Sequence, residues 1–456
     1  MSPEDKEIEI VKVYIKNKTE GTFMLAKYIV EKYNIITVGE HEPEIFVYQE
    51  GYYKPAKISV IFPEVQRILQ YHVNKNAKNE VFHKIADMTH HDREIFIQTD
   101  LKFIPLKNGV YNYETDELLP HSPDYRFTHI FPIVFDPKAV CPKTEAFFGQ
   151  ILSPEQRQTM EEWLGFYFIR NYMYKKAMIL VGDGDTGKTT LLEVITHFIG
   201  TQNISSVSLQ KMSGDRFSAA QLYGKHGNIV DELSARDISD TGAFKIATGG
   251  GNITGEYKFG NQFAFINYSK FTFACNQIPD VSSDANDNAY FNRWIVMRFE
   301  NIIEKKIPNF IKTLATEEER SGLFNLAMKG LERLLEQGHF TYNFSASETK
   351  IEMLRSGSSL AMFASEMIEQ DDNAEMTKEV LYEHYANFCK DRMISTMTKI
   401  MVGKKLTDYV PYVSDGLISI LDSKGRATQT RGWRNLKIKG EKKPENIDTL
   451  DDFDTK

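Results

Sequence analysis

Cysteine is scarce in this sequence: the 456-residue chain contains only Cys141, Cys275 and Cys389. None of them belongs to a CxxC or Cys/His spacing, so we expect reduced thiols rather than a disulfide framework or a zinc site. Long apolar runs are lacking as well, and the N-terminus MSPEDKEIEI is acidic and polar. Neither a membrane span nor a secretory signal is therefore predicted, and we expect a cytoplasmic protein without a membrane partner.

The chain also lacks an excess of positive charge. Its net charge is -8 and its pI is about 5.9, which taken alone argues against a nucleic-acid partner. The basic residues are unevenly distributed, however, because residues 390–440 hold eleven Lys or Arg against four Asp or Glu. This part of the chain can contact phosphates although the whole chain is acidic.

The composition predicts a folded protein of several domains, since 41% of the residues are hydrophobic and 12% are aromatic. Short apolar runs alternate with helical patterns in the middle of the chain, which indicates an α/β fold with a parallel sheet flanked by helices. We also expect an aromatic hairpin over 44–56 and helices over 359–370 and 376–392. The predicted organisation is a mainly helical N-terminal domain 1–95, a region 96–148 with a β-hairpin at Asn108-Gly109, the α/β core 149–345, a C-terminal domain 346–440 and an acidic tail 441–456.

One motif binds phosphate in many proteins. The stretch VGDGDTGKTTLLE, residues 181–193, follows the apolar strand AMILV, opens a helix and matches GxxxxGK[ST]. Its backbone N–H groups and the start of the helix are expected to surround the phosphates of ATP, with Lys188 on the β- and γ-phosphates and Thr189 on Mg²⁺. The predicted nucleotide-binding residues are Gly182, Gly184, Asp185, Thr186, Gly187, Lys188, Thr189 and Thr190.

A second motif supplies the acids that a phosphate-loop enzyme needs. In GNIVDELS, a short apolar strand ends at Asp231 and Glu232, and Asp231 follows Lys188 by 43 residues. Asp231 is predicted to bind Mg²⁺ together with Thr189, and Glu232 to act as the base that polarises water.

Two further strands end in candidate catalytic residues. KFTFACNQIP ends at Asn276, whose amide can orient the attacking water or sense the γ-phosphate. In AYFNRWIVMRF, Arg293 precedes an apolar strand and is the candidate arginine that stabilises the transition state in a neighbouring subunit, with Arg298 as the alternative.

The order of these motifs resembles that of the superfamily 3 helicases of the AAA+ class, in particular the poxvirus and phage/plasmid primase-helicase branch. The resemblance rests on VGDGDTGKTT, IVDELS, TGGGNITGEYKFGNQFAF, FTFACNQIP and FNRWIVMRF, which lie within about 120 residues. Outside this core, LKNGVYNYETDELLPHSPDY is similar to a hairpin of the family's helicase-associated region. RGWRNLKIK is similar to the end of its winged-helix domain.

The resemblance implies a P-loop AAA+ ATPase core and a C-terminal winged helix. It also implies a homo-hexameric ring that moves 3′ to 5′ on single-stranded and forked DNA, with ATP bound between subunits. The segment between Asp231 and Asn276 would carry a DNA-gripping hairpin, and basic residues of the winged helix would contact phosphates. The candidate DNA-binding residues are Tyr257, Lys258, Phe259, Lys404, Lys405, Arg426 and Arg431.

Two features depart from the family pattern. The family often has paired arginines where this chain has Asn292-Arg293, and about 95 residues before the hairpin region are too few for a primase domain. A separate primase or a polymerase is therefore a candidate partner. Two other functions remain open: an ATP-switched, origin-binding replication initiator without processive unwinding, and a small-molecule P-loop kinase.

Overall fold

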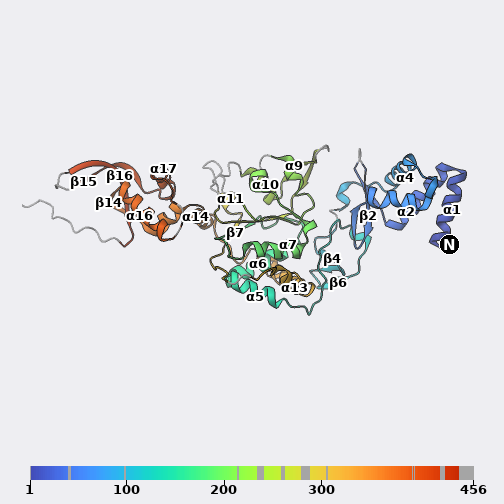
Figure 1. Cartoon of the computed structure of the whole chain (residues 1–456), viewed down its shortest axis with the longest axis horizontal. Helices are drawn as coiled ribbons and strands as arrows, with labels where there is room; N and C mark the ends of the chain where they lie inside the picture. Colours follow the sequence, from blue (N-terminus) through green and yellow to red (C-terminus); the bar gives the residue numbers. More distant parts are fainter. Residues whose placement is uncertain are drawn as a thin grey trace, which may run out of the picture.

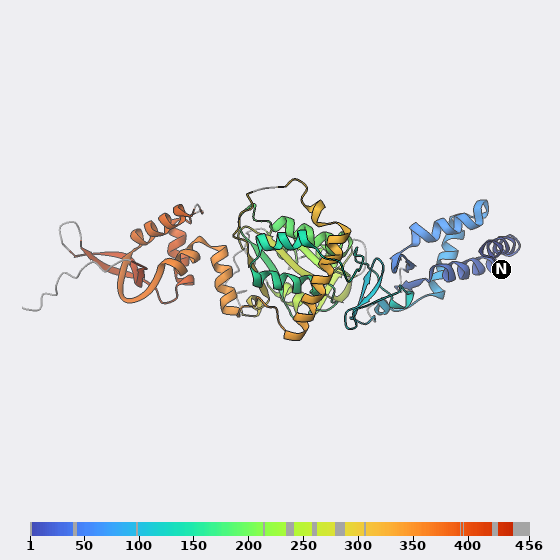
Figure 2. The same ribbon diagram turned by 90° about the horizontal axis from the view of Figure 1, so that it is seen from below.

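The computed structural model of the chain has three lobes in a row (Figure 1). The N-terminal lobe and the C-terminal lobe lie on opposite sides of a central lobe, and the view turned by 90° shows the same order (Figure 2). The structure describes residues 2–39, 43–96, 99–212, 215–233, 241–257, 262–278, 288–304, 307–392, 394, 396–421 and 427–440.

The N-terminal lobe combines helices with a small antiparallel sheet. Asn17 separates its first two helices: the Asn17 backbone N–H bonds to the end of one helix, and the side chain accepts from Glu20 N of the next. The aromatic hairpin predicted over 44–56 is present, with Tyr48 opposite Tyr53. The elements are α1 Pro3–Lys16, α2 Lys18–Tyr33, β1 Ile36–Val38, β2 Glu44–Gln49, β3 Tyr52–Pro55, a π-helix Lys57–Ile61, α3 Phe62–Leu69 and α4 Lys75–Met88.

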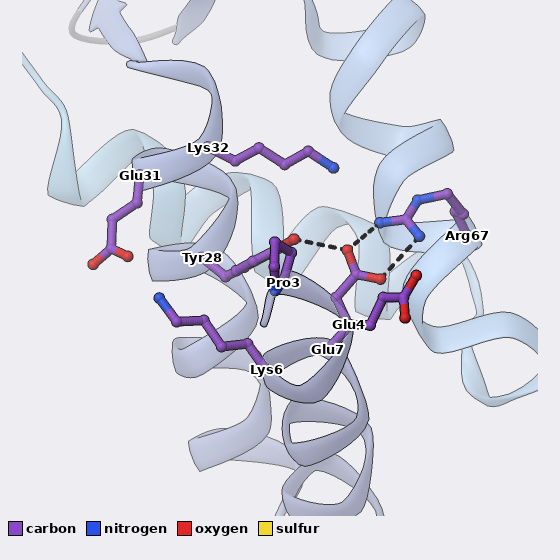
Figure 3. Close-up of a pocket in the computed structure, with 8 residues that line it drawn as sticks. All are labelled: Pro3, Glu4, Lys6, Glu7, Tyr28, Glu31, Lys32 and Arg67. Carbon is purple, nitrogen blue, oxygen red and sulfur yellow. Dashed lines mark hydrogen bonds and ion pairs between the residues drawn. The ribbon is translucent and has the colours of Figure 1, made fainter. Parts of the chain in front are cut away.

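A polar cavity of about 460 Å³ lies between α1, α2 and α3 of this lobe (Figure 3). The Arg67 guanidinium donates to both carboxylate oxygens of Glu7 and to those of Glu64. Lys32 Nζ donates to Glu64 at 2.6 Å, and the Tyr28 hydroxyl donates to Glu7 at 2.7 Å. Charge is therefore balanced around the cavity, and these bonds join the three helices.

The hairpin region that follows shares its core with the central lobe. β4 Phe103–Leu106 and β5 Gly109–Asn112 pair around the predicted Asn108-Gly109 turn, and β6 Glu117–Leu119 adds a third strand. Leu106 and Phe131 from this region are fully buried in one cluster with Phe168 and Phe324 of the central lobe. The region therefore folds onto the central lobe rather than forming a separate core.

The central lobe contains the predicted parallel sheet flanked by helices. Its strand order is β13-β7-β12-β9-β8, and all neighbouring strands run parallel. β7 is buried along its whole length, as expected for a central parallel strand. The strands are β7 Ala177–Val181, β8 Ile204–Ser205, β9 Gly227–Val230, β12 Lys270–Cys275 and β13 Trp294–Arg298, and a separate hairpin is formed by β10 Asn252–Glu256 and β11 Gln262–Ile266.

Helices cover both faces of this sheet (Figures 1 and 2). One face carries the longer helices α5, α6, α7 and α13, and the other carries α10 and α11, so that each face has its own apolar cluster. The helices of the central lobe are α5 Pro142–Ile151, α6 Pro154–Phe166, α7 Lys188–Ile199, α8 Leu209–Met212, α9 Arg216–Ala220, α10 Gly242–Gly249, α11 Asn288–Phe291, α12 Ile311–Leu314 and α13 Glu317–Gln337. Short 3-10 helices span Gln70–His72, Arg93–Phe96, Pro123–Tyr125 and Thr201–Asn203.

The C-terminal lobe places three helices beside a three-stranded sheet with the order β14-β16-β15. Its core includes Leu360, Tyr385, Leu406 and Trp433, all of which are buried. The connection to the central lobe is α14 Ala346–Gly357. The lobe itself contains α15 Ser359–Met367, β14 Ile368–Thr377, α16 Lys378–Asp391, α17 Lys399–Tyr409, β15 Ser414–Leu421 and β16 Ala427–Ile438.

The helix predicted over 359–370 is wrong at its end, because α15 stops at Met367 and the chain continues as β14. β14 is a polar strand that pairs with β16. Lys437 Nζ of β16 lies 3.0 Å from the Glu369 carboxylate, and Arg434 lies 3.1 Å from that of Glu375. The sequence of β14 lacks an apolar alternation, so its pairing and ion pairs with β16 stabilise it as a strand.

Within the described part of the chain, no helix combines the length and the apolar character needed to cross a membrane. The three cysteines are buried and unpaired. Burial raises the pKa of the Cys141 and Cys275 thiols to about 12, so both thiols stay protonated at neutral pH.

A pair of buried histidines joins the hairpin region to the base of the sheet. The rings of His129 and His226 have centroids 4.2 Å apart, and His226 Nδ1 lies 2.9 Å from the Tyr167 carbonyl oxygen, to which a neutral ring donates. Burial lowers the pKa of His226 to about 3. Burial also lowers the pKa of His129 well below its ordinary value, and the neighbouring His226 adds to this effect.

These pKa shifts predict acid sensitivity. Because the folded pKa values lie below the unfolded ones, the unfolded chain binds more protons below about pH 6.5 and the folded state loses stability as pH falls. At pH 5 the loss is about 2 kcal/mol for His226, and His129 adds a loss of the same sign. Urea unfolding at pH 7.5 and pH 5 measures it. The double variant His129→Gln/His226→Gln should reduce this pH dependence, whereas the exposed His90→Gln should not. If the free energy of unfolding changed equally between pH 7.5 and pH 5 in the wild type and both variants, the prediction would be contradicted.

Candidate phosphate-binding site

The predicted site residues follow the carboxyl ends of neighbouring parallel strands. The loop 182–189, called the phosphate loop below, follows β7, while Asp231 follows β9 and Asn276 follows β12. β7 lies between β12 and β13, where the strand order reverses. Ligands of open α/β sheets bind at the carboxyl edge at such a reversal.

Close packing and unusual backbone angles shape the phosphate loop. A Cβ atom on Gly182 would lie 2.3 Å from the Phe299 carbonyl oxygen, so only glycine fits there without displacing the backbone. Asp185 has φ +64° and Gly187 has φ +91°, which turns the chain sharply into α7. The Asp185 carbonyl accepts from Ile303 N at 2.9 Å, so the segment after β13 also holds the loop.

Lys188 is the first residue of α7, and its side chain folds back over the loop. Its Nζ donates to the Gly182 carbonyl at 2.6 Å, to the Asp183 carbonyl at 2.7 Å and to Thr186 Oγ1 at 3.3 Å. The residue is 9% exposed, and burial lowers its pKa below that of a free lysine. The ammonium group is therefore already directed into the loop, where the N-terminus of α7 also favours an anion.

The predicted metal ligands lie together. Thr189 Oγ1 donates to Asp231 Oδ1 at 3.1 Å, across the edge of the sheet. A hydroxyl and a carboxylate are oxygen ligands that suit Mg²⁺, which keeps several waters and needs few protein ligands. The described residues contain no cluster of three or more His, Cys, Asp or Glu side chains that could hold a metal ion.

The other predicted residues of this site lie on the same loops and strand ends. Glu232 and Asn276 are both exposed at the same edge. The backbone between their strands is fixed, because Leu233 N donates to the Ala274 carbonyl at 2.8 Å. Gly184 is exposed in the loop, and Thr190 is half-buried in the first turn of α7. The phosphate loop, Asp231, Glu232 and Asn276 thus all lie at the carboxyl edge of the sheet.

The two candidate arginines are both bound within their own chain. Arg293 donates to Thr248 Oγ1 at 2.9 Å and to the Ala289 carbonyl, so its side chain lies against α10. Arg298, at the end of β13, has its Nε 2.8 Å from the Glu352 carboxylate of α14. The sequence did not identify Thr248 and Glu352 as partners of these arginines, because neither residue belongs to a recognisable motif.

The candidate DNA-binding residues are partly described. Tyr257 is 52% exposed at the end of β10, and its ring stacks on Phe263 of β11 at 5.0 Å. Lys404 is exposed and Lys405 is half-buried on α17, and Arg431 is exposed on β16. The other three predicted residues, Lys258, Phe259 and Arg426, lie outside the described residues.

A second cavity, of about 610 Å³, lies between the hairpin region and α13. Tyr111 and Phe135 line it together with Leu331, and Glu114 and Glu332 give it acidic walls. Neither this cavity nor the one in the N-terminal lobe includes a residue of the phosphate loop. Lys188 Nζ lies within the loop, held by the Gly182 and Asp183 carbonyls.

Two sequence families match the chain. Residues 60–153 match the family described as "D5 N terminal like", and residues 180–293 match a family of unknown function, DUF5906. The first match crosses residue 95, where the sequence predicted a domain boundary. The second spans the phosphate loop, Asp231, Asn276 and Arg293.

Individual relatives are distant. A protein of Acanthamoeba polyphaga mimivirus, "Putative helicase L207/L206", is 30% identical over 128 residues, which cover 26% of this chain and 13% of the relative. Two apo structures of the NrS-1 C-terminal region are similar at 12% and 13% identity, with TM-scores of 0.47 and 0.45. Each match covers 91% of this chain, and 98% and 99% of the respective structures. The family matches confirm the resemblance to the poxvirus D5-type primase-helicases: the chain carries a D5-type N-terminal region followed by a DUF5906 region.

Proposed function

We propose that the chain is an ATP-dependent DNA helicase that acts as a homo-hexameric ring in the replication of a virus, phage or plasmid. The observation that carries the proposal is the convergence of the phosphate loop, the Thr189–Asp231 pair, Glu232 and Asn276 at one sheet edge. The D5-type region and the mimivirus relative named as a helicase support DNA unwinding as the use of the hydrolysis.

Lys188 binds the phosphates in this proposal. Its three hydrogen bonds to the loop are exchanged for bonds to the β- and γ-phosphate oxygens, while the loop N–H groups and the start of α7 hold the same anion. Glu232 accepts a proton from the attacking water, and the Asn276 amide orients that water towards the γ-phosphate. Both side chains are exposed at the sheet edge and can therefore reach a ligand.

The residues present fit a magnesium ion. Thr189 Oγ1 and the Asp231 carboxylate, 3.1 Å apart, would hold it, and their hydrogen bond already sets the distance between the two ligands. When bound, Mg²⁺ supplies neutralisation of charge on the phosphates. Asp231 therefore has a binding role, which leaves Glu232 as the base.

Arg293 is proposed to act on the ATP of a neighbouring subunit. Its bonds to Thr248 and Ala289 anchor it beside α10 of its own chain. Arg298 is also held within its own chain, by the Glu352 carboxylate, and is the alternative arginine. If Arg293 acts on the ATP of a neighbouring subunit, hydrolysis depends on assembly of the subunits, as in an AAA+ ring.

Two surfaces are proposed to contact DNA. Tyr257 follows β10 directly and presents an exposed ring that can stack on a base. Lys258 and Phe259 follow Tyr257 in the sequence, before β11 begins at Gln262. The C-terminal lobe has the order helix, strand, helix, helix, strand, strand, which supports a winged helix whose Lys404, Lys405 and Arg431 contact phosphates. Translocation is proposed to run 3′ to 5′ on single-stranded DNA.

Replacing Lys188 tests the proposed hydrolysis. Lys188→Ala removes the cation that stabilises the phosphates, so the ATPase rate should fall at least about 100-fold and unwinding of a forked duplex should stop. The exposed Lys143→Ala serves as control and should retain both activities. Unwinding by Lys188→Ala at the wild-type rate would refute the mechanism. Specific duplex binding by the wild-type protein without strand displacement would instead favour a replication initiator.

Two glycines with different surroundings test the loop geometry. In Gly182→Ala the new methyl group meets the Phe299 carbonyl oxygen, whereas the Cβ of Gly149→Ala, on α5 outside the loop, has no heavy atom within 4 Å. We expect Gly182→Ala to weaken binding of a fluorescent ATP analogue at least about tenfold, which corresponds to about 1.4 kcal/mol. Gly149→Ala should bind like the wild type. Equal affinities of the two variants would show that the loop does not need its contact with Phe299.

Mixing variants tests whether Arg293 acts between subunits. Arg293→Ala should lose about 1,000-fold in ATPase rate while retaining nucleotide affinity, because a donor to the transition state is missing. Adding Lys188→Ala subunits, which still carry Arg293, should restore part of the activity at the intact sites of Arg293→Ala subunits. The control Arg157→Ala should need no rescue. Failure of the mixture to recover activity, with mixed rings present by mass measurement, would place Arg293 in its own site.

A further inference from the structure

The segment that follows β13 lies directly against the phosphate loop. Phe299 N donates to the Val181 carbonyl at 2.8 Å, and the Phe299 carbonyl oxygen leaves no room for a side chain at Gly182. Farther along, Ile303 N donates to the Asp185 carbonyl at 2.9 Å. These contacts span most of the loop, so a movement of the loop must be accommodated by residues 299–303.

Arg298 lies at the start of this segment and connects it to another part of the molecule. It pairs in register with Val181, the last residue before the loop, and its Nε lies 2.8 Å from the Glu352 carboxylate. The two side chains are 28% and 22% exposed, so water screens their attraction less than that of a surface pair. Arg298 Nε and Nη2 are both buried and make no hydrogen bond in the described part of the chain, so Arg298 contacts Glu352 as an ion pair without an aligned hydrogen bond.

Glu352 belongs to α14, the helix that leads into the C-terminal lobe. Met353 of α14 is 4% exposed in the apolar cluster on this face of the sheet, and Lys350 Nζ lies 5.8 Å from the centre of the Phe291 ring. Ser358 follows α14 directly, and its side chain caps α15 by accepting from Ala361 N. A change in the position of α14 therefore reaches the C-terminal lobe without a flexible linker between them.

We propose that the Arg298–Glu352 ion pair couples nucleotide binding at the phosphate loop to the C-terminal lobe. The inference rests on the proposed function, because it takes ATP as the ligand of the loop. Nucleotide binding shifts the loop and residues 299–303, which changes the position of Arg298 and, through Glu352, that of α14. Arg298 is thus a positioning residue, and because coupling is reciprocal, DNA held by the C-terminal lobe favours the nucleotide-bound loop.

Three variants of the full chain separate this role from direct contact with the nucleotide. Glu352→Gln removes the charge on α14 with little change in shape, and Arg298→Gln removes the partner charge. The exchange variant R298E/E352R restores the ion pair with the two charges reversed. It should therefore recover a coupling that depends on the pair, but not phosphate binding by position 298, which would then carry a negative charge. Glu145→Gln is the matched control, because Glu145 forms a 3.4 Å ion pair with Arg157 between α5 and α6.

Three measurements apply to each variant: the affinity for a fluorescent ATP analogue, the ratio of ATPase rates with and without single-stranded DNA, and proteolysis of residues 338–345 with and without nucleotide. Glu352→Gln and Arg298→Gln should keep nucleotide affinity within about twofold but lose about fivefold in DNA stimulation, together with the effect of nucleotide on proteolysis. The exchange variant should recover at least half of both effects. Glu145→Gln should match the wild type.

The outcomes distinguish the two proposals. Unchanged DNA stimulation in Glu352→Gln, with nucleotide bound normally, would overturn the coupling and leave the proposed function intact. So would a tenfold loss of affinity in Arg298→Gln alone, because Arg298 would then be a direct ligand. Wild-type protein that binds no nucleotide would overturn the proposed function and the coupling together. Circular dichroism checks the fold of the exchange variant, and if it is unfolded, Glu352→Gln alone decides the matter.

Discussion

The parallel pairing of β7 with β12 and β13 is the constraint on which the candidate site depends. Parallel strands bring their carboxyl ends to one edge, so the loop after β7 and Asn276 after β12 meet there. The pairing with β13 also places Phe299 against Gly182, where it limits the loop to glycine. A register shift in any of these strands would separate residues whose chemistry requires contact.

Each cation of the site already has a partner within the chain. Lys188 bonds to loop carbonyls, Arg293 to Thr248, and Arg298 pairs with Glu352. In the proposed site a phosphate ligand must therefore exchange the Lys188 bonds rather than fill an open charge, which costs part of the binding free energy. This exchange gives the nucleotide-bound protein a different set of contacts from the free protein. Such a difference is the physical basis of any coupling to other lobes.

The hairpin region and the C-terminal lobe are joined to the sheet of the central lobe in different ways. The hairpin region shares a buried core with the central lobe through Leu106 and Phe131, and the His129–His226 contact adds a connection that requires neutral rings. The C-terminal lobe has its own core and connects through α14. The shared core fixes the hairpin region on the central lobe, whereas the C-terminal lobe is attached by one helix and an ion pair. Relative motion is therefore expected between the central and C-terminal lobes.

The sequence by itself determined the phosphate loop, the acids that follow β9, the hairpins and the parallel sheet, because each depends on local spacing and apolar periodicity. It also carried the family resemblance, through motifs that stay in order along the chain. Only the tertiary structure decided the end of α15 and the polar strand β14, which is stabilised by its pairing with β16. It likewise decided the contacts of Gly182 with Phe299, of Arg293 with Thr248 and of Arg298 with Glu352. Those contacts join residues far apart in the chain, and pairwise packing and charge between distant segments leave no periodic trace in the sequence.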